Sequence, residues 1–201
     1  MEAWAAQLDE SMQRLEGCLP RLARLPLGGT AVGSGVNCHP DFSTLVLGLL
    51  SASTGIPCSI APSRYKNIAS LDTIVELSGH LKAGAMAINK IAEDLRWMNS
   101  GPFSGLAEIR LPALQPGSSI MPAKVNPVIP EAVRMACAQI VGNDATLTLA
   151  GMGGNFQLNT MLPLATQKIV ESIELLADSA VALHEKAIRG MVINEEACRK
   201  A

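Results

Sequence analysis

The sequence predicts an all-α protein, a bundle of long helices. Hydrophobic residues make up 48% of the 201 residues but aromatic residues only 3%, so the core must consist of aliphatic side chains, alanine and methionine, as close-packed helices allow. Apolar residues recur at the three- and four-residue steps of a helix, whereas no segment alternates at the two-residue period of a strand. We therefore expect one helical domain over residues 1–201 and essentially no sheet.

Five helices follow from apolar spacing and end signals. Residues 2–25 predict an amphipathic helix and residues 41–53 a shorter one. The third helix carries an unbroken heptad seam of about seven turns and ends before Gly101-Pro102. Its seam residues are Ile74, Leu77, Leu81, Gly84, Ile88, Ile91, Leu95 and Met98.

The last two helices show similar signals. Pro130 and Glu131 suit a first helical turn, because proline lacks the N–H that would be unpaired there and a carboxylate complements the helix dipole. A second seam is stopped by Gly190 and consists of Ile169, Ile173, Leu176, Ala180, Leu183 and Ala187. Long heptad faces often exceed what one chain can bury, so we expect association into a larger bundle.

Three irregular stretches connect the helices: residues 25–40, 55–65 and 101–130. The first contains the glycine-rich run 27–37, which lacks dinucleotide-binding spacing and predicts a tight turn against helix ends. The last is about 30 residues long with little periodicity, and a loop of that length in a compact domain is usually functional or disordered.

Composition excludes several classes of function. The formal net charge of -2 argues against nucleic acid as a partner, and the uncharged stretches 42–63 and 145–167 are too interrupted by polar residues, glycine and proline to span a membrane. Residues 1–4 do not begin a signal peptide. Five widely spaced cysteines without a CxxC pair predict reduced thiols in the cytoplasm, with no disulfide frame and no metal site.

The most informative segment is the run Pro-Gly-Ser-Ser-Ile-Met-Pro-Ala-Lys-Val-Asn-Pro at residues 116–127. Lys124 is the only ionisable side chain between residues 111 and 130, and it lies near a glycine, two serines and the amide of Asn126. One cation, paired hydroxyls, an amide and exposed backbone N–H groups suit the binding of a small anion. We call residues 116–127 the signature loop.

The signature loop resembles the sequence GSSxMPxKxNP of the fumarase/aspartase superfamily at every specified position. The resemblance implies that Ser118 abstracts the C3 proton of a small dicarboxylate, and that Ser119, Lys124, Val125 and Asn126 contact a substrate carboxylate. It also implies that Glu131 pairs with an active-site histidine, although taken alone this residue is most simply a helix N-terminal charge. No metal or organic cofactor is implied.

Within the superfamily, several segments favour fumarate hydratase over aspartate ammonia-lyase. Gly28-Gly29-Thr30, Asn37-Cys38-His39-Pro40, Trp97 and Gly154-Asn155-Phe156 are similar to hydratases, whereas Ala123, residues 128–131 and residues 194–198 are similar to ammonia-lyases. We therefore expect a carbon-oxygen lyase that adds water to fumarate to give L-malate, a step of the tricarboxylic acid cycle. Addition of ammonia to give L-aspartate is the alternative.

The resemblance also implies that parts of the family's protein are missing from this chain. The family's active-site Thr-His pair and its small C-terminal domain have no counterpart in residues 1–201, which resemble the central helical domain alone. Family members are homotetramers in which each active site draws on three subunits. We therefore expect the isolated chain to be inactive, and a catalytically incomplete helical oligomerisation core is a further alternative.

Overall fold

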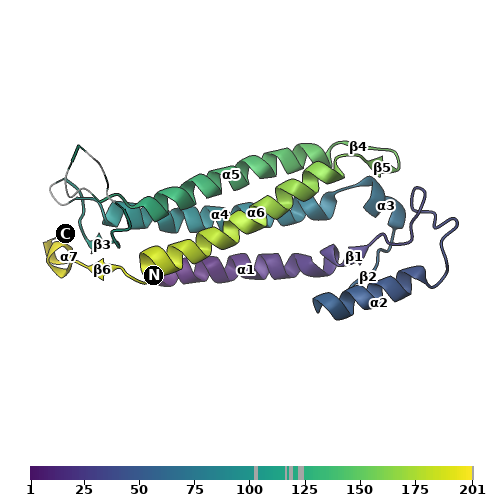
Figure 1. The fold of residues 1–201 in the computed structure, drawn as a ribbon, viewed down its shortest axis with the longest axis horizontal. Coiled ribbons are helices and arrows are strands. Elements are labelled where there is room, and N and C mark those ends of the chain that lie inside the picture. The colour runs from purple at the N-terminus through teal and green to yellow at the C-terminus, as the bar shows by residue number, and fades with distance from the viewer. Residues whose placement is uncertain (102–103, 116, 118–119, 122–124, 201) are drawn as a thin grey trace.

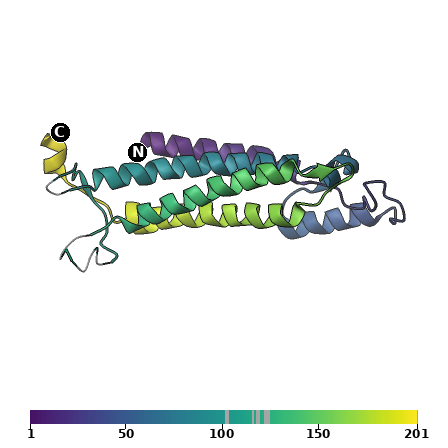
Figure 2. The same ribbon diagram turned by 90° about the horizontal axis from the view of Figure 1, so that it is seen from above.

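Four long helices run side by side along the long axis of the molecule in the computed structural model, alternating in direction from one to the next (Figures 1 and 2). The structure describes residues 1–101, 104–115, 117, 120–121 and 125–200. Helix α4 contacts each of the other three long helices, so it is the central member of the bundle. The four are α1 (Glu2–Leu22), α4 (Asp72–Met98), α5 (Val128–Gly151) and α6 (Leu162–Leu183).

Shorter elements lie at the two ends of the bundle. Helix α2 (Phe42–Thr54) and helix α3 (Arg64–Ala69) lie at one end, and a π-helical turn (His184–Ile188) and α7 (Glu195–Lys200) follow α6 at the other (Figure 1). The five predicted helices are thus confirmed, and the all-α fold class with them. Helix α3, the π-helical turn and α7 were not predicted, because six residues or fewer leave almost no periodicity to detect.

Strand structure is limited to three ladders of two residues per strand within the described residues. Strand β1 (Arg24–Leu25) pairs in parallel with β2 (Ser59–Ile60). Strand β3 (Ile109–Arg110) pairs antiparallel with β6 (Val192–Ile193), and β4 (Gly154–Asn155) pairs antiparallel with β5 (Leu158–Asn159). These ladders fasten loops to one another and form no layer, so the prediction of essentially no sheet describes the architecture correctly.

The heptad seam of α4 forms the centre of the core. Leu81, Ile88, Ile91 and Leu95 are buried against α5 and α6, and none of the eight seam residues is exposed. This chain covers most of the seam by itself, with five of its residues buried and Ile74, Leu77 and Met98 half-buried.

The seam predicted for α6 and the turn after it is confirmed at four of its six positions, because Ile169, Leu183 and Ala187 are buried and Leu176 packs against the core. Ile173 and Ala180 are exposed, and the neighbouring serines Ser172 and Ser179 are buried instead. Serine is small and its hydroxyl can bond to the preceding helical turn, as Ser172 does to the carbonyl of Lys168 at 2.8 Å, so helices can approach closely at serine positions. A seam read from apolar residues alone therefore misses the two inward-facing serines of this helix.

A polar layer crosses the bundle between α4, α5 and α6. The carboxylate of Asp144 accepts from the Ser78 hydroxyl at 2.7 Å and from Lys82 at 2.5 Å. Beside it, the Asn143 amide donates to the Ser172 hydroxyl at 3.1 Å. Because an unpaired buried polar group is costly, this layer favours one axial register of the three helices.

Glycine is required in the turn that follows α1. Gly33 has φ of +108°, and a Cβ there would lie 2.5 Å from the backbone nitrogen of Tyr65. Gly28 has φ of +74°, and a Cβ there would lie 2.3 Å from the Ser43 hydroxyl. The glycine-rich run is therefore the predicted tight turn against helix ends, and side chains would not fit at these two positions.

None of the described helices is both long enough and apolar enough to cross a membrane.

Candidate functional site

The signature loop connects α4 to α5 at the end of the bundle that also carries the N-terminus of α1 and the C-terminal elements (Figure 1). Of its twelve residues, the structure describes 117, 120–121 and 125–127. Ser118, Ser119 and Lys124 lie outside the described residues, so their predicted roles remain predictions. The described parts of the site are the segment before the signature loop (residues 107–112, the upstream stem), the residues that end the loop (125–127, the downstream neck) and the first turn of α5.

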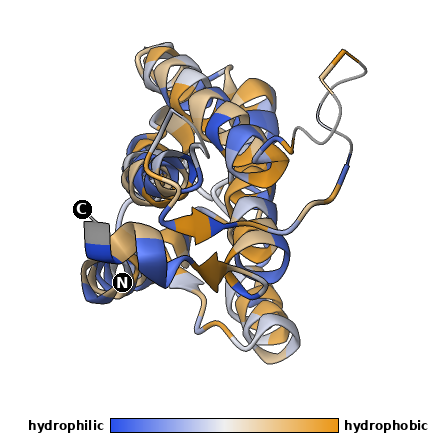
Figure 3. Cartoon of the chain, turned by 90° about the vertical axis from the view of Figure 1, so that its left-hand side faces the viewer, coloured by the Kyte–Doolittle hydropathy of each residue, from blue (hydrophilic) through white to orange (hydrophobic). Residues whose placement is uncertain are grey.

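The upstream stem is held at several points after α4 ends. Asn99 Oδ1 accepts from the backbone N–H of Leu111 at 2.9 Å, and Ile109 and Leu111 are buried. Strand β3 pairs with β6, and Figure 3 shows the two strands beside each other at this end of the bundle, largely hydrophobic in colour. The chain thus leaves the core at a fixed place before it enters the signature loop.

The downstream neck is closed by Asn126. Its side-chain Nδ2 donates to the backbone carbonyl of Gly117 at 3.0 Å, so Gly117 and Asn126 lie close together although they are nine residues apart in the sequence. The Asn126 carbonyl accepts from the N–H of Val128 at 2.9 Å, which ties the neck to the start of α5. Val125, the neighbouring predicted binding residue, is 44% exposed. Asn126 and Val125 therefore lie together at the mouth of the loop.

Glu131 lies in the first turn of α5, where the helix dipole favours a carboxylate. Its side chain is 40% exposed, and Arg96 Nε approaches its Oε1 no closer than 3.9 Å. Arg96 is more tightly engaged with Glu93, at 2.9 Å, and Glu93 also pairs with Arg134. Glu131 is thus held loosely by its own chain and keeps room for another partner.

The chain's own histidines do not supply that partner. His39 lies near Asp41, His80 near Glu76 and His184 near Glu185, at 3.6–4.0 Å, and none of the three pairs with Glu131. Nor do the described residues bring together three histidine, cysteine, aspartate or glutamate side chains that could hold a metal ion.

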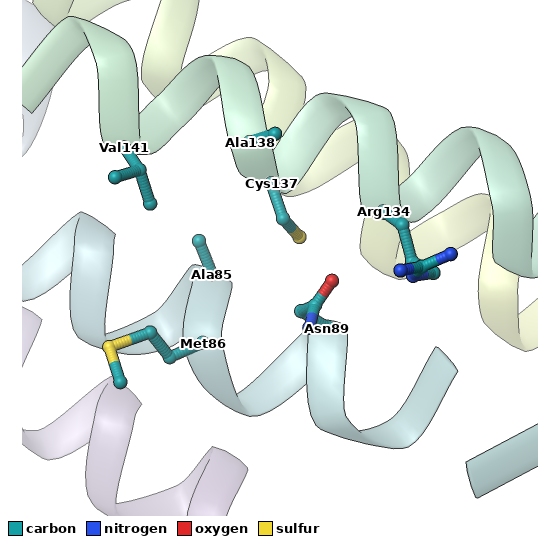
Figure 4. Close-up of a pocket in the computed structure, with 7 residues that line it drawn as sticks. All are labelled: Ala85, Met86, Asn89, Arg134, Cys137, Ala138 and Val141. Atoms are coloured by element: carbon teal, nitrogen blue, oxygen red, sulfur yellow. The ribbon is translucent and has the colours of Figure 1, made fainter. Parts of the chain in front are cut away.

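A separate groove lies between α4 and α5 along the bundle (Figure 4), with a volume of about 380 Å³. Its lining is mostly apolar, and burial raises the pKa of the Cys137 thiol in it to about 11. None of the predicted site residues lines this groove, so it is not part of the loop site. The lining residues are Ala85, Met86, Asn89, Arg134, Cys137, Ala138 and Val141.

Three residues of the site were missed by the sequence reasoning. Asn99 and Asn194 hold the stem of the loop, and Arg96 reaches toward Glu131. An asparagine directly after a helix end is a recognisable signal for a capping or loop-tying role, so Asn99 could have been suspected. Asn194 could not, because its partners are about ninety residues away in the sequence.

Comparison with known proteins is consistent with this architecture. A family model described as Lyase matches residues 1–142. The class II fumarate hydratase of Xylella fastidiosa (strain 9a5c) is 51% identical over 194 residues, which are 96% of this chain and 41% of that protein. The corresponding protein of Mycobacterium tuberculosis (strain ATCC 25618 / H37Rv) is 46% identical over 198 residues, 98% of this chain and 42% of that one.

The fold is also found among solved structures. The crystal structure of recombinant class II fumarase from Schistosoma mansoni superposes with a TM-score of 0.96 at 33% identity, covering 99% of this chain and 45% of that chain. This chain thus spans less than half the length of the relatives that it matches. The family model, the sequence identities and the superposition agree that the chain belongs to the lyase family of the fumarase/aspartase superfamily and has a class II fumarase fold.

Proposed function

We propose that the protein containing this chain is a fumarate hydratase, which adds water to fumarate in the anti sense to give L-malate. The observation that carries the proposal is the 51% identity over 96% of the chain to a class II fumarate hydratase, together with a signature loop that matches at every specified position. The same identity favours water over ammonia as the second substrate, because that relative is named for the hydration of fumarate.

The chemistry explains why such a loop is needed. In the reverse direction, removal of the C3 proton of L-malate creates a doubly charged aci-carboxylate, from which hydroxide leaves C2 to give fumarate. An enzyme must stabilise this anion with oriented donors and cations. Each such donor can contribute ~3 kcal/mol to the transition state. In our proposal Ser118 takes the proton, and Ser119, Lys124, Val125 and Asn126 bind the carboxylate whose charge grows. Serine requires neighbouring donors to act as a base, and the loop is rich in them.

We propose that Glu131 pairs with a histidine that this chain does not supply. The loose contact between Glu131 and Arg96, at 3.9 Å, supports this role, because a tightly paired carboxylate would be unavailable. The proposal makes residues 1–201 the central helical domain of a longer protein and one of several contributors to each active site. On this basis the isolated chain should bind dicarboxylates weakly and turn over none.

Assembly into a homotetramer is part of the same proposal. Met135 and Leu149 are exposed on α5 and are two heptads apart, so they share a side of the helix, and Met152 is exposed directly after the helix end. On α2, which has no charged residue, Leu45 and Leu49 are exposed. Exposed apolar faces of this kind usually mark contact surfaces. They support association through α2 and α5 and not through the seam of α4.

We propose a reducing compartment such as the cytoplasm. All five cysteines are unpaired in the structure, and two of them, Cys18 and Cys137, are buried. Free thiols are the rule in reducing compartments, whereas oxidising compartments favour disulfides.

The direct test is loss of fumarate absorbance with the complete protein, with and without ammonium, beside Ser118→Ala. Ser104→Ala is a matched control, because Ser104 is exposed on the same connection between α4 and α5. We expect fumarate loss in water alone, a decrease of several orders of magnitude in Ser118→Ala, and wild-type turnover in Ser104→Ala.

Other outcomes have definite meanings. Loss of fumarate only with ammonium would assign the ammonia-lyase reaction instead. Equal turnover in Ser118→Ala would remove Ser118 as the base. No turnover by the complete protein would leave the helical oligomerisation core as the function of this chain.

A further inference from the structure

The stem that carries the signature loop is fastened by the C-terminal segment of the chain. Ile109 and Arg110 of β3 pair with Ile193 and Val192 of β6. These partners are more than eighty residues apart in sequence, so the contact is tertiary. The stem therefore depends on a segment that lies beyond the last long helix.

Asn194 makes the most specific of these contacts. Its backbone N–H donates to the carbonyl of Glu108 at 2.8 Å, and its side-chain Nδ2 donates to the carbonyl of Ala107, also at 2.8 Å. Ala107 has φ of +51°, a left-handed conformation that non-glycine residues hold only where their surroundings enforce it. Asn194 thus donates hydrogen bonds to two consecutive carbonyls, and one of them belongs to Ala107, the residue in the left-handed conformation.

The same side chain has a second role that can be separated from the first. Asn194 Oδ1 accepts from the N–H of Ala197 at 3.4 Å and so caps the start of α7. The amide nitrogen acts on the stem, and the amide oxygen acts on the helix. A carboxylate at this position would keep the acceptor and lose the donor.

Asn99 holds the other side of the stem with the opposite polarity. Its Oδ1 accepts from the N–H of Leu111, so here an oxygen of the side chain is the functional atom. Close packing continues just beyond, since a Cβ at Gly190 would lie 2.7 Å from Pro112 Cγ. The stem from residue 107 to residue 112 is thus held by the donor amide of Asn194, the acceptor amide of Asn99 and the two-residue ladder between β3 and β6.

We propose that Asn194 and Asn99 are positioning residues for the reaction of the signature loop, and that the C-terminal segment 190–194 fixes the position of the loop's upstream end. This inference rests on the proposed function. The downstream end of the loop is fixed by α5, so the upstream stem is the part that can misplace it. Misplacement of a catalytic group by about 1 Å can cost on the order of 100-fold in rate.

The two asparagines allow a test in which one substitution has opposite outcomes. Asn194→Asp removes the donor and sets a carboxylate against the Ala107 carbonyl, whereas Asn99→Asp keeps its acceptor for Leu111. Asn67→Asp is the matched control at the far end of the bundle, where Asn67 Nδ2 also donates to a backbone carbonyl, that of Arg24, at 2.9 Å.

The first readout is amide hydrogen exchange over residues 107–115. We expect exchange to be roughly tenfold faster in Asn194→Asp, as the loss of a hydrogen bond predicts. Exchange there should be unchanged in Asn99→Asp and Asn67→Asp, and α7 should stay protected in all three. Unchanged exchange in Asn194→Asp, or equal acceleration in Asn99→Asp, would overturn the proposal.

The second readout is turnover of fumarate by the complete protein. In Asn194→Asp we expect kcat to fall on the order of 10-fold or more with a smaller change in KM, because orientation is lost and binding groups are kept. Faster exchange with wild-type kcat would show that the stem contact is structural only. If the wild-type protein does not hydrate fumarate, the proposed function fails, while the exchange comparison still decides whether Asn194 holds the stem.

Discussion

Replacing Ile88 by alanine should destabilise the chain far more than replacing Met86, two residues away on the same helix. Ile88 is 5% exposed in the core between α4, α5 and α6, whereas Met86 is 64% exposed in the groove between α4 and α5. The pair therefore tests whether the heptad seam of α4 is the inward face of the bundle.

The magnitude follows from the burial. Isoleucine has three side-chain carbons more than alanine, and at ~0.8 kcal/mol per buried carbon their transfer contributes about 2.4 kcal/mol. The cavity that remains adds to this, which places the loss at ~2–5 kcal/mol. For a chain of this length a loss of 3 kcal/mol lowers the melting temperature by roughly 6–12 °C. Met86→Ala should stay within about 0.5 kcal/mol of the wild type.

Urea denaturation followed by far-ultraviolet circular dichroism measures both variants on the 201-residue chain. A loss below about 1 kcal/mol for Ile88→Ala would be too small for a filled core position. A loss in Met86→Ala equal to that in Ile88→Ala would show that α4 is turned the other way, and the account of the core would be wrong.

Two further predictions concern buried polar groups. Asp144→Ala should cost about 2 kcal/mol in the same assay, because it leaves the Ser78 hydroxyl and the Lys82 ammonium without their partner; a neutral result would show that the polar layer does not stabilise the bundle. Because burial raises the pKa of Cys137 from an ordinary 9.0 to about 11, the folded state holds this proton more tightly, so its contribution to stability is complete below pH 9 and is lost as the pH rises toward 11. Cys137→Ala should flatten the fall in stability over that window, and a slope equal to that of the wild type would contradict the assignment.

The long helices could be predicted because each buries one face in the core, and that face recurs at the helical period along the sequence. In α4 the inward positions are almost all apolar, so spacing alone identified the face correctly. In α6 two inward positions are serines, which composition marks as polar although their hydroxyls are compatible with a helix interior. Periodicity therefore found that helix and most of its inward face, but not its two inward serines.

The signature loop could be recognised from its residues, but its attachment could not. Asn126 belongs to the matched pattern, yet its bond to Gly117 depends on how the loop closes in space. The contacts of Asn194 with residues 107 and 108 depend on where α6 ends relative to α4. A local pattern specifies which chemical groups a loop carries, whereas its position depends on how helices that are distant in the sequence are aligned with one another.

The central claim, that this chain forms part of a fumarate hydratase, is tested most directly by the product formed from fumarate in D2O, observed by proton nuclear magnetic resonance. We expect the complete protein to convert fumarate to L-malate with deuterium at C3 in a single configuration, as anti addition requires, and we expect added ammonium to yield no aspartate. L-aspartate as the product, or fumarate that remains unchanged beside a folded and assembled protein, would contradict it.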